Sequence, residues 1–312
     1  ALSANAVLLA LAAIAGTISP SGKEVGPFLS LEQAILPQTA PDARRTGLFA
    51  AYNLVGSLSS ALGALVAAVP PLLGVSTVVG GRLLLWAYAL AALLLLLLYT
   101  RLSPKAEVIR PDRAAPRRGG LHRSRGIVAR LAVLFAVDSF AGAFVVQSLI
   151  AYWFHLRYGV DIAALGAIFF GVNLCAALSF LAAAPLARRI GLLNTMVFTH
   201  LPSNVLLVLV ALMPNAGLAI AVLLLRSLLS QLDVPTRQSY TMAVVAPEER
   251  AAAAGITSVA RSAAAAAAPA FAGATLAVPA LGLPFLIAGS LKIVYDLAIL
   301  AIFRNIRPPE EY

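Results

Sequence analysis

Long apolar segments alternate with short polar ones along the chain. Each apolar segment is about 20 residues long, enough for a helix to cross the ~30 Å hydrocarbon core of a bilayer. Transmembrane strands would instead show apolar and polar residues alternating over about ten residues. The pattern predicts an all-α integral membrane protein whose nine spanning helices lie at 7–28, 47–69, 82–100, 131–153, 162–185, 193–213, 216–236, 253–277 and 283–303.

Basic residues divide the connecting loops into two alternating classes. One class contains only Arg82 and Arg157. The other class contains Arg44, Arg45, nine basic residues between 101 and 130, Arg188, Arg189, Arg237, Arg250, Arg304 and Arg307. Loops rich in Lys and Arg lie on the cytoplasmic side of a membrane. The second class is therefore predicted to be cytoplasmic, together with the carboxy terminus.

Composition supports the membrane class and excludes several functions. Hydrophobic residues make up 61% of the chain and charged residues 12%, whereas soluble domains have about 45–50% and about 25%. The net charge of +10 would suit nucleic acid, but nine of the 23 basic residues lie in one loop. We therefore expect a lipid bilayer as partner, a monomer and no nucleic acid. Catalytic motifs and metal-ligand spacings are absent from the sequence, which predicts no enzyme, cofactor or metal site.

A weak internal repeat joins Ala40–Ser57 to Ala246–Ala263, 206 positions later. Both copies place Ala-Pro, an acidic residue and an arginine before an apolar run, and repeats of this kind are typical of transporters built from two related halves. The second copy follows far more membrane sequence than the first. The difference leads us to expect about 75 residues, or about three helices, before Ala1. The chain is thus predicted to be an amino-terminally truncated fragment.

The segment 101–130 is rich in Pro and Arg and reads as a flexible cytoplasmic linker. It separates the predicted bundle 1–100 from a six-helix bundle at 131–312. With this organisation, the chain resembles the major facilitator superfamily, in which two six-helix halves flank a long basic loop. The segment Leu223–Tyr240, followed by APEERAAAAGITSVARS, looks like the tenth and eleventh helices of bacterial members. The resemblance implies that the nine spans are helices four to twelve of an expected twelve, in a bacterial inner membrane.

The loop around Arg188, Arg189 and Gly191 resembles the second-half copy of the family's signature loop. Arg189 and Gly191 fit the pattern, whereas Arg188 stands where an acidic residue belongs. The drug/proton antiporter signature of the fifth helix is missing, because no proline lies between Gly56 and Gly63. These departures favour the superfamily over its antiporter subgroup.

Charged and amide side chains inside the spans are concentrated on three helices. An ionisable residue in mid-span costs about 2.5–3.5 kcal/mol on insertion scales, so it is expected to face a cavity or a partner. The three spans are 7–28, 131–153 and 216–236. The resemblance implies that they are the family's fourth, seventh and tenth helices, which line its central cavity. The candidates for substrate binding or coupling are Lys23, Glu24, Glu32, Asp138, Gln147, Arg226, Gln231 and Asp233.

Each candidate also has a structural interpretation. Prolines interrupt the helix around Lys23 and Glu24, which marks either a substrate site or a simple kink. Asp138 is either a desolvated carboxylate that exchanges a proton or a member of a static ion pair. Arg226 is either an anion clamp or a helix-packing residue.

The remaining polar residues inside the spans have either a structural interpretation or two alternative ones. Asp233 can exchange protons or pair with Arg226 or Arg237. Lys292 and Asp296 lie four residues apart and are predicted to neutralise each other. Arg261 reaches a cavity or snorkels, and Asn204 is expected to bond between helices.

These features predict a secondary active transporter that moves a small solute by alternating access. Proton-coupled efflux of a drug-like or amphipathic compound is the mode we expect. The alternative is a transporter-like membrane protein without flux that acts as a sensor or an assembly partner.

Overall fold

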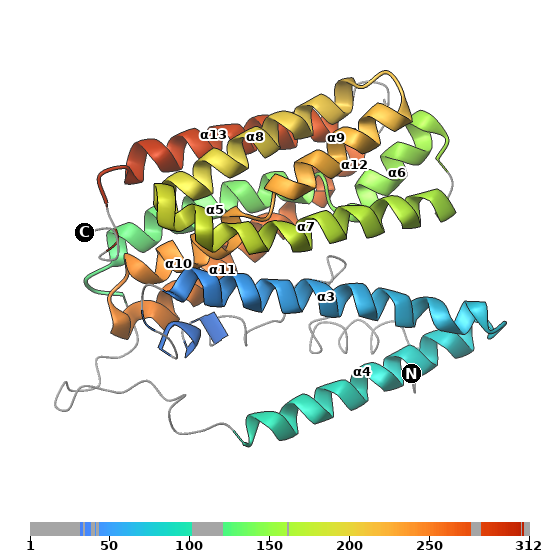
Figure 1. The fold of residues 1–312 in the computed structure, drawn as a ribbon, viewed down its shortest axis with the longest axis horizontal. Coiled ribbons are helices and arrows are strands. Elements are labelled where there is room, and N and C mark those ends of the chain that lie inside the picture. The colour runs from blue at the N-terminus through green and yellow to red at the C-terminus, as the bar shows by residue number, and fades with distance from the viewer. Residues whose placement is uncertain are drawn as a thin grey trace.

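The computed structural model describes residues 32–33, 35–38, 41, 44–101, 121–160, 162–275, 282–306 and 308. Every regular element in these ranges is a helix (Figure 1). In chain order they are η1 (Leu36–Gln38), α3 (Arg45–Leu72), α4 (Thr77–Tyr99), α5 (Arg125–Ala143), α6 (Gln147–Tyr158), α7 (Ile162–Ile190), α8 (Leu192–Leu212), α9 (Ala216–Leu229), α10 (Asp233–Ala243), η4 (Pro247–Glu249), α11 (Arg250–Ala267), α12 (Pro269–Thr275) and α13 (Leu283–Phe303).

Eight of the nine predicted spans coincide with these helices, and the first, 7–28, lies outside the described residues. Within the described part, six helical segments are long and apolar enough to cross a membrane. They are Val78–Tyr99, Arg125–Tyr158, Ala164–Ile190, Leu192–Leu212, Ala216–Ala243 and Leu283–Phe303. The expectation of a multi-pass, all-helical membrane protein is confirmed at this level.

Three predicted spans are discontinuous, contrary to the expectation of uninterrupted helices. The first break separates α5 from α6, where Val146 adopts an extended conformation. The second, after Leu229, separates α9 from α10, and the third, at Ala268, separates α11 from α12. Pro235 and Pro269 lie just beyond the second and third breaks. Proline lacks the N–H that would continue the helical ladder, which accounts for these two interruptions.

The helices are also longer at their predicted cytoplasmic ends than the apolar runs suggest. α5 begins at Arg125, before the predicted start at 131, and α10 ends at Ala243, beyond the predicted end at 236. Polar side chains in these end turns lower the hydropathy of a window without interrupting the backbone hydrogen bonds. Asp138 and Asp233 therefore lie nearer the middle of their membrane-spanning segments than the apolar runs suggest.

Two apolar cores enclose a polar layer within the bundle formed by α5 to α13. One core surrounds Trp153 and Phe285, and the other surrounds Tyr240 and Tyr295. The polar layer lies between the two cores along the same helices. On α8, for example, Met196 belongs to the Tyr295 core, Leu207 to the Trp153 core, and His200 and Asn204 fall between them.

A glycine allows α8 and α13 to pack closely beside this polar layer. A Cβ atom on Gly289 would lie 2.4 Å from Cγ2 of Val208 and 3.1 Å from the backbone oxygen of Asn204. Only a residue without a side chain permits such an approach. The contact brings the polar residues of α8 within reach of Asp296 on α13.

α3 connects the helices before residue 102 to the later bundle, because it packs along α7 and α10 (Figure 1). α4 lies at the margin, beside α3, and its leucines from Leu93 to Leu98 are exposed. In a bilayer these side chains would face lipid or another helix. α4 is therefore a peripheral helix, whereas the charged residues of the later bundle lie in its interior.

A buried carboxylate holds the beginning of α5. The backbone amides of His122, Arg123 and Ser124 donate to Glu249 at 2.6, 2.9 and 2.8 Å. Burial alone raises the pKa of Glu249, but the amide hydrogen bonds and the Ser124 hydroxyl outweigh it and lower that pKa to about 2. A negative charge at a helix amino terminus is also favoured by the helix dipole. Glu249 therefore anchors the loop after α10 to the entrance of α5.

Candidate functional site

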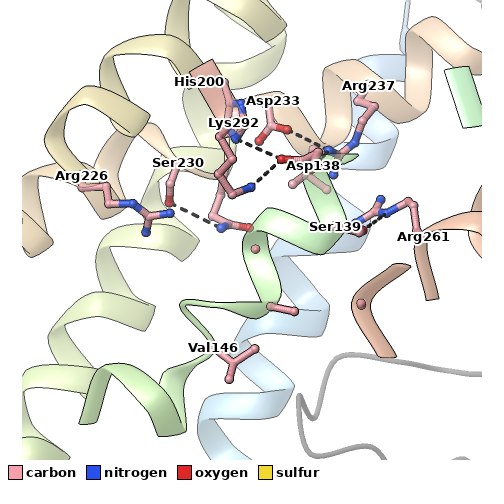
Figure 2. Close-up of a pocket in the computed structure, with 15 residues that line it drawn as sticks. Asp138, Ser139, Val146, His200, Arg226, Ser230, Asp233, Arg237, Arg261 and Lys292 are labelled. Atoms are coloured by element: carbon pink, nitrogen blue, oxygen red, sulfur yellow. Dashed lines mark hydrogen bonds and ion pairs between the residues drawn. The ribbon is translucent and has the colours of Figure 1, made fainter. Parts of the chain in front are cut away.

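The polar layer borders a cavity of about 260 Å³. Its walls come from α5, α8, α9, α10, α11 and α13, together with the breaks at Val146 and at Ser230 and Gln231 (Figure 2). Six charged side chains line it: Asp138, Arg226, Asp233, Arg237, Arg261 and Lys292. Charged groups inside a membrane are costly unless they are paired or face water. Their contacts therefore indicate what this cavity can do.

Asp138 occupies the centre of the cluster. Nζ of Lys292 lies 2.5 Å from one of its carboxylate oxygens, and Nη1 of Arg237 donates to the other at 3.0 Å (Figure 2). The Asp138 side chain is only 7% exposed. Two cations on separate helices thus neutralise this carboxylate and tie α5 to α10 and α13.

Arg237 is shared between two carboxylates. The same Nη1 atom lies 3.3 Å from Asp233, one helical turn earlier on α10. The guanidinium also lies over the ring of Phe135, 5.4 Å from its centroid, an arrangement in which the ring attracts the cation. Arg237 is therefore held by three contacts, which makes it a fixed part of the cavity wall.

His200 links the central carboxylate to a second acidic group behind it. Its Nδ1 atom lies 2.7 Å from Asp296, and its Nε2 atom lies 3.9 Å from Asp138. Asn204 donates from its amide nitrogen to the other Asp296 oxygen at 2.8 Å. His200 on α8 therefore lies between the carboxylates of α5 and α13.

Arg226 and Arg261 differ from the other cations of the cluster. Neither forms an ion pair with a carboxylate of the described residues. Arg261 donates from Nε to the Ser139 hydroxyl at 3.1 Å, and buried Nε of Arg226 has no hydrogen-bond partner within the described part of the chain. Figure 2 shows both guanidiniums turned inward from opposite sides of the Asp138–Lys292 pair.

Four of the eight candidates predicted from sequence meet at the cavity: Asp138, Arg226, Gln231 and Asp233. Gln147 does not line it and is exposed at the start of α6. Glu32 accepts hydrogen bonds from the hydroxyls of Tyr52 and Tyr99, on α3 and α4, away from the cavity. Lys23 and Glu24 lie outside the described residues.

One predicted pairing of charge is wrong. Lys292 pairs with Asp138 on α5 and not with Asp296 one turn away, because Asp296 is held by His200 and Asn204 on α8. Of the two interpretations of Asp138, the ion pair is present in the structure, since two cations contact the carboxylate. The static pair suggested for Asp233 and Arg237 is confirmed, as is Asn204 as an interhelical hydrogen-bonding residue.

Sequence reasoning missed His200 and treated Lys292 as structural. A single histidine in an apolar run carries no spacing signal, because its partners lie on α5 and α13, 62 and 96 residues away. The loop predicted to resemble the family signature lies at the α7–α8 junction. Arg188 and Arg189 are exposed there, and Gly191 adopts φ +86°, a backbone conformation that favours glycine.

Comparisons with known proteins identify the family and the fold of the chain. Residues 8–269 match the Major Facilitator Superfamily. The chain is also 28% identical to the uncharacterized membrane protein YJR124C of Saccharomyces cerevisiae, over 97% of this chain and 76% of that protein. The chain therefore belongs to the Major Facilitator Superfamily, and its resemblance to that family is confirmed.

Two solved structures share the architecture. The human organic anion transporter MFSD10 (TETRAN) aligns with a TM-score of 0.67 and 17% identity, over 87% of this chain and 67% of that one. A bacterial homologue of the iron transporter ferroportin, in an outward-facing state, aligns with a TM-score of 0.63 and 16% identity, over 95% and 72%. At such identities the likeness shows the fold. The protein is thus a transporter-like membrane protein, and its family is one of transporters and not of enzymes.

Proposed function

We propose that the protein is a secondary transporter that carries a small solute through the cavity by alternating access. The observation that carries the proposal is a partly open, charged cavity enclosed between two apolar cores. A purely structural role would be served by fully paired charges, yet Arg226 and Arg261 lack carboxylate partners among the described residues. Intramembrane charges that face a cavity mark solute or ion pathways.

Contacts between α3 and α10 supply the closed side of such a cycle. The Thr46 hydroxyl donates to the Ser239 hydroxyl at 2.9 Å, and the Asn53 amide donates to the Gln238 side chain at 2.7 Å. All four residues lie toward the predicted cytoplasmic ends of their helices. These bonds would hold that side shut in this conformation, and they would break when the two bundles rock apart.

The helix breaks support movement around the cavity. Val146, Ser230 and Gln231 lie at two breaks and also line the cavity. Interrupted helices recur at the substrate sites of transporters, because backbone groups without helical partners can face a solute. A solute bound there would contact the segments at which the helices change direction.

Proton exchange through Asp138 and His200 is the coupling mechanism we propose. Asp138 faces Lys292, Arg237 and His200, while His200 faces Asp138, Asp296, Asn204 and the ring of Tyr295. A proton on His200 would alter the charge beside the ion pairs that join α5, α10 and α13. Protonation would therefore bias the packing of those helices. Glu24 stays a further coupling candidate.

Efflux of an amphipathic compound across a bacterial inner membrane is the direction and location we propose, on the basis of the sequence. The alternative of a non-transporting sensor makes the opposite prediction about flux. Reconstitution of the protein in lipid vesicles decides between transport and the non-transporting sensor.

The test is solute-driven proton movement in proteoliposomes under an imposed pH gradient, reported by a pH dye inside the vesicles. Neutralising Asp138 alone would leave the buried Lys292 without a carboxylate partner, a loss of about 3–5 kcal/mol. The variants are therefore His200→Gln and the balanced double variant Asp138→Asn with Lys292→Gln. We expect both to lose proton movement while remaining folded. Arg82→Gln, an exposed change on α4, is the control.

Coupling that persists in both variants and in Glu24→Gln would contradict the proton mechanism. An absence of flux for every solute tested, in a folded and correctly inserted wild-type protein, would favour the sensor.

A further inference from the structure

The charges around the cavity do not balance. Among the described residues that line it, four side chains are basic and two are acidic, which leaves an excess of two positive charges. Asp296, which lies behind His200, reduces the excess to one while His200 is neutral. A site inside a membrane that carries surplus positive charge attracts anions and disfavours cations.

The surplus is located on Arg226 and Arg261. Lys292 and Arg237 already hold Asp138, and Arg237 also holds Asp233. The two remaining guanidiniums come from α9 and α11 and turn inward from opposite sides of the Asp138–Lys292 pair (Figure 2). Each guanidinium presents planar N–H donors that match the oxygen atoms of a carboxylate, sulfonate or phosphate. Both arginines line the cavity, so an anion bound there would lie in their field.

The rest of the cavity wall adds a preference for a small organic body. Ser139, Ser230 and Gln231 provide further polar groups, while Ala143, Val146 and Ala265 provide an apolar side. The volume of about 260 Å³ lies just below the range of about 300–1,000 Å³ found for drug-sized ligands. A compact molecule with one acidic group and one apolar face satisfies both kinds of wall.

We infer that the solute is a small organic anion, drawn into the cavity by the surplus positive charge of Arg226 and Arg261. The inference rests on the proposed function, because it names the class of solute that the same cavity carries. Among the described residues that line the cavity, a cation would find no available carboxylate, since Asp138 and Asp233 are both engaged by basic side chains. A neutral compound would leave the two guanidiniums uncompensated.

Calorimetric titration of the purified full chain in detergent separates these classes. The probes are benzenesulfonate, the neutral benzenesulfonamide and the permanent cation benzyltrimethylammonium, each with its naphthalene counterpart. All are compact aromatic compounds, so charge is the main difference within each set. We expect the sulfonates to bind at least about tenfold more tightly than the neutral and cationic probes, which corresponds to about 1.4 kcal/mol. Equal binding across a set, tighter cation binding or no anion binding overturns the inference.

Matched variants assign the binding to the two arginines. Arg226→Gln and Arg261→Gln are each expected to weaken sulfonate binding about tenfold or more, whereas Arg226→Lys keeps a charge and is expected to retain part of it. Arg82→Gln is the control and should bind as the wild type does. Thermal unfolding of each variant verifies the fold. Sulfonate affinity that is unchanged in both glutamine variants would overturn the assignment, and a variant that fails to fold leaves the other and Arg226→Lys to decide.

Binding and flux together distinguish this inference from the proposed function. Anion binding without flux of any probe in proteoliposomes would support the anion site and contradict transport. Flux of a neutral or cationic probe with no anion binding would support transport and overturn the anion site.

Discussion

At the scale of single residues, the determining feature is which charges have partners. Asp138 is surrounded by Lys292, Arg237 and His200, so it organises the cluster and does not stand alone as a proton carrier. Arg226 and Arg261 provide the surplus charge that a solute can use. We therefore propose that function depends on the few residues that the ion-pair network leaves incompletely compensated.

Glu249 permits a pH prediction outside the membrane-spanning segments. Its folded-state pKa of about 2 lies below its ordinary value of 4.5. Its ionised form thus stabilises the fold above about pH 4.5, and this contribution disappears as the pH falls toward 2. Hydrogen bonds to a charged group contribute about 1.5–3 kcal/mol. We expect Glu249→Gln to lower the unfolding free energy by about that amount at pH 7.

The measurement is the thermal unfolding of wild type and Glu249→Gln in detergent at pH 7, 4 and 2.5. The gap in Tm should narrow steadily as the pH falls. Glu248→Gln, a substitution at the neighbouring exposed residue, is the control and should change little at any pH. A gap for Glu249→Gln that is the same at pH 7 and pH 2.5 would show that its charge is not responsible.

At the scale of helices, the interruptions and the contacts of α3 are the features on which the proposed movement depends. Two of the interrupted helix pairs, α5–α6 and α9–α10, contribute backbone breaks to the cavity wall. α3 contacts α10 through paired polar side chains that can part without exposing an apolar surface. These contacts predict which side of the protein must open.

A reversible crosslink tests the contact between α3 and α10. The variant Thr46→Cys with Ser239→Cys is made in a Cys175→Ser background, which removes the only native cysteine. The native hydroxyls are 2.9 Å apart, and a disulfide needs Cβ atoms about 3.5–4.5 Å apart. Oxidation is expected to form the bond and to abolish flux in proportion to the crosslinked fraction.

Reduction with dithiothreitol should restore flux, and each single-cysteine variant should be insensitive to oxidation. A fully crosslinked protein that transports as fast as the reduced one would mean that α3 and α10 stay together throughout the cycle. The alternating-access proposal would then need a different closing contact.

At the scale of the whole molecule, the sequence predicted the helices well and the site only in part. Apolar runs identified eight described spans because a bilayer imposes a fixed length on each of them. The breaks at Val146 and Ala268 were missed, since a short interruption leaves the apolar run unchanged. Asp138, Arg226, Gln231 and Asp233 were found because polar residues inside apolar runs are costly.

The partners of these residues could not be found in the same way. Local spacing suggested that Lys292 neutralises Asp296. Close packing at Gly289 instead brings Asp296 into contact with His200 and Asn204 on α8. Lys292 then turns to Asp138, 154 residues earlier. Pairing across helices depends on the tertiary packing, which the local spacing of residues along the chain does not reveal.

The central claim is that solute passes through the cavity beside Asp138, and a single cysteine placed in its wall tests this most directly. Ser139 lines the cavity and accepts a hydrogen bond from Arg261, so Ser139→Cys in the Cys175→Ser background places a thiol beside the proposed solute. Flux of the tightest-binding probe in proteoliposomes is measured before and after reaction with a membrane-impermeant sulfonated methanethiosulfonate. The account predicts that modification abolishes flux and that the probe slows modification, with Cys175→Ser alone unaffected. Complete modification of the introduced thiol with unchanged flux would contradict it.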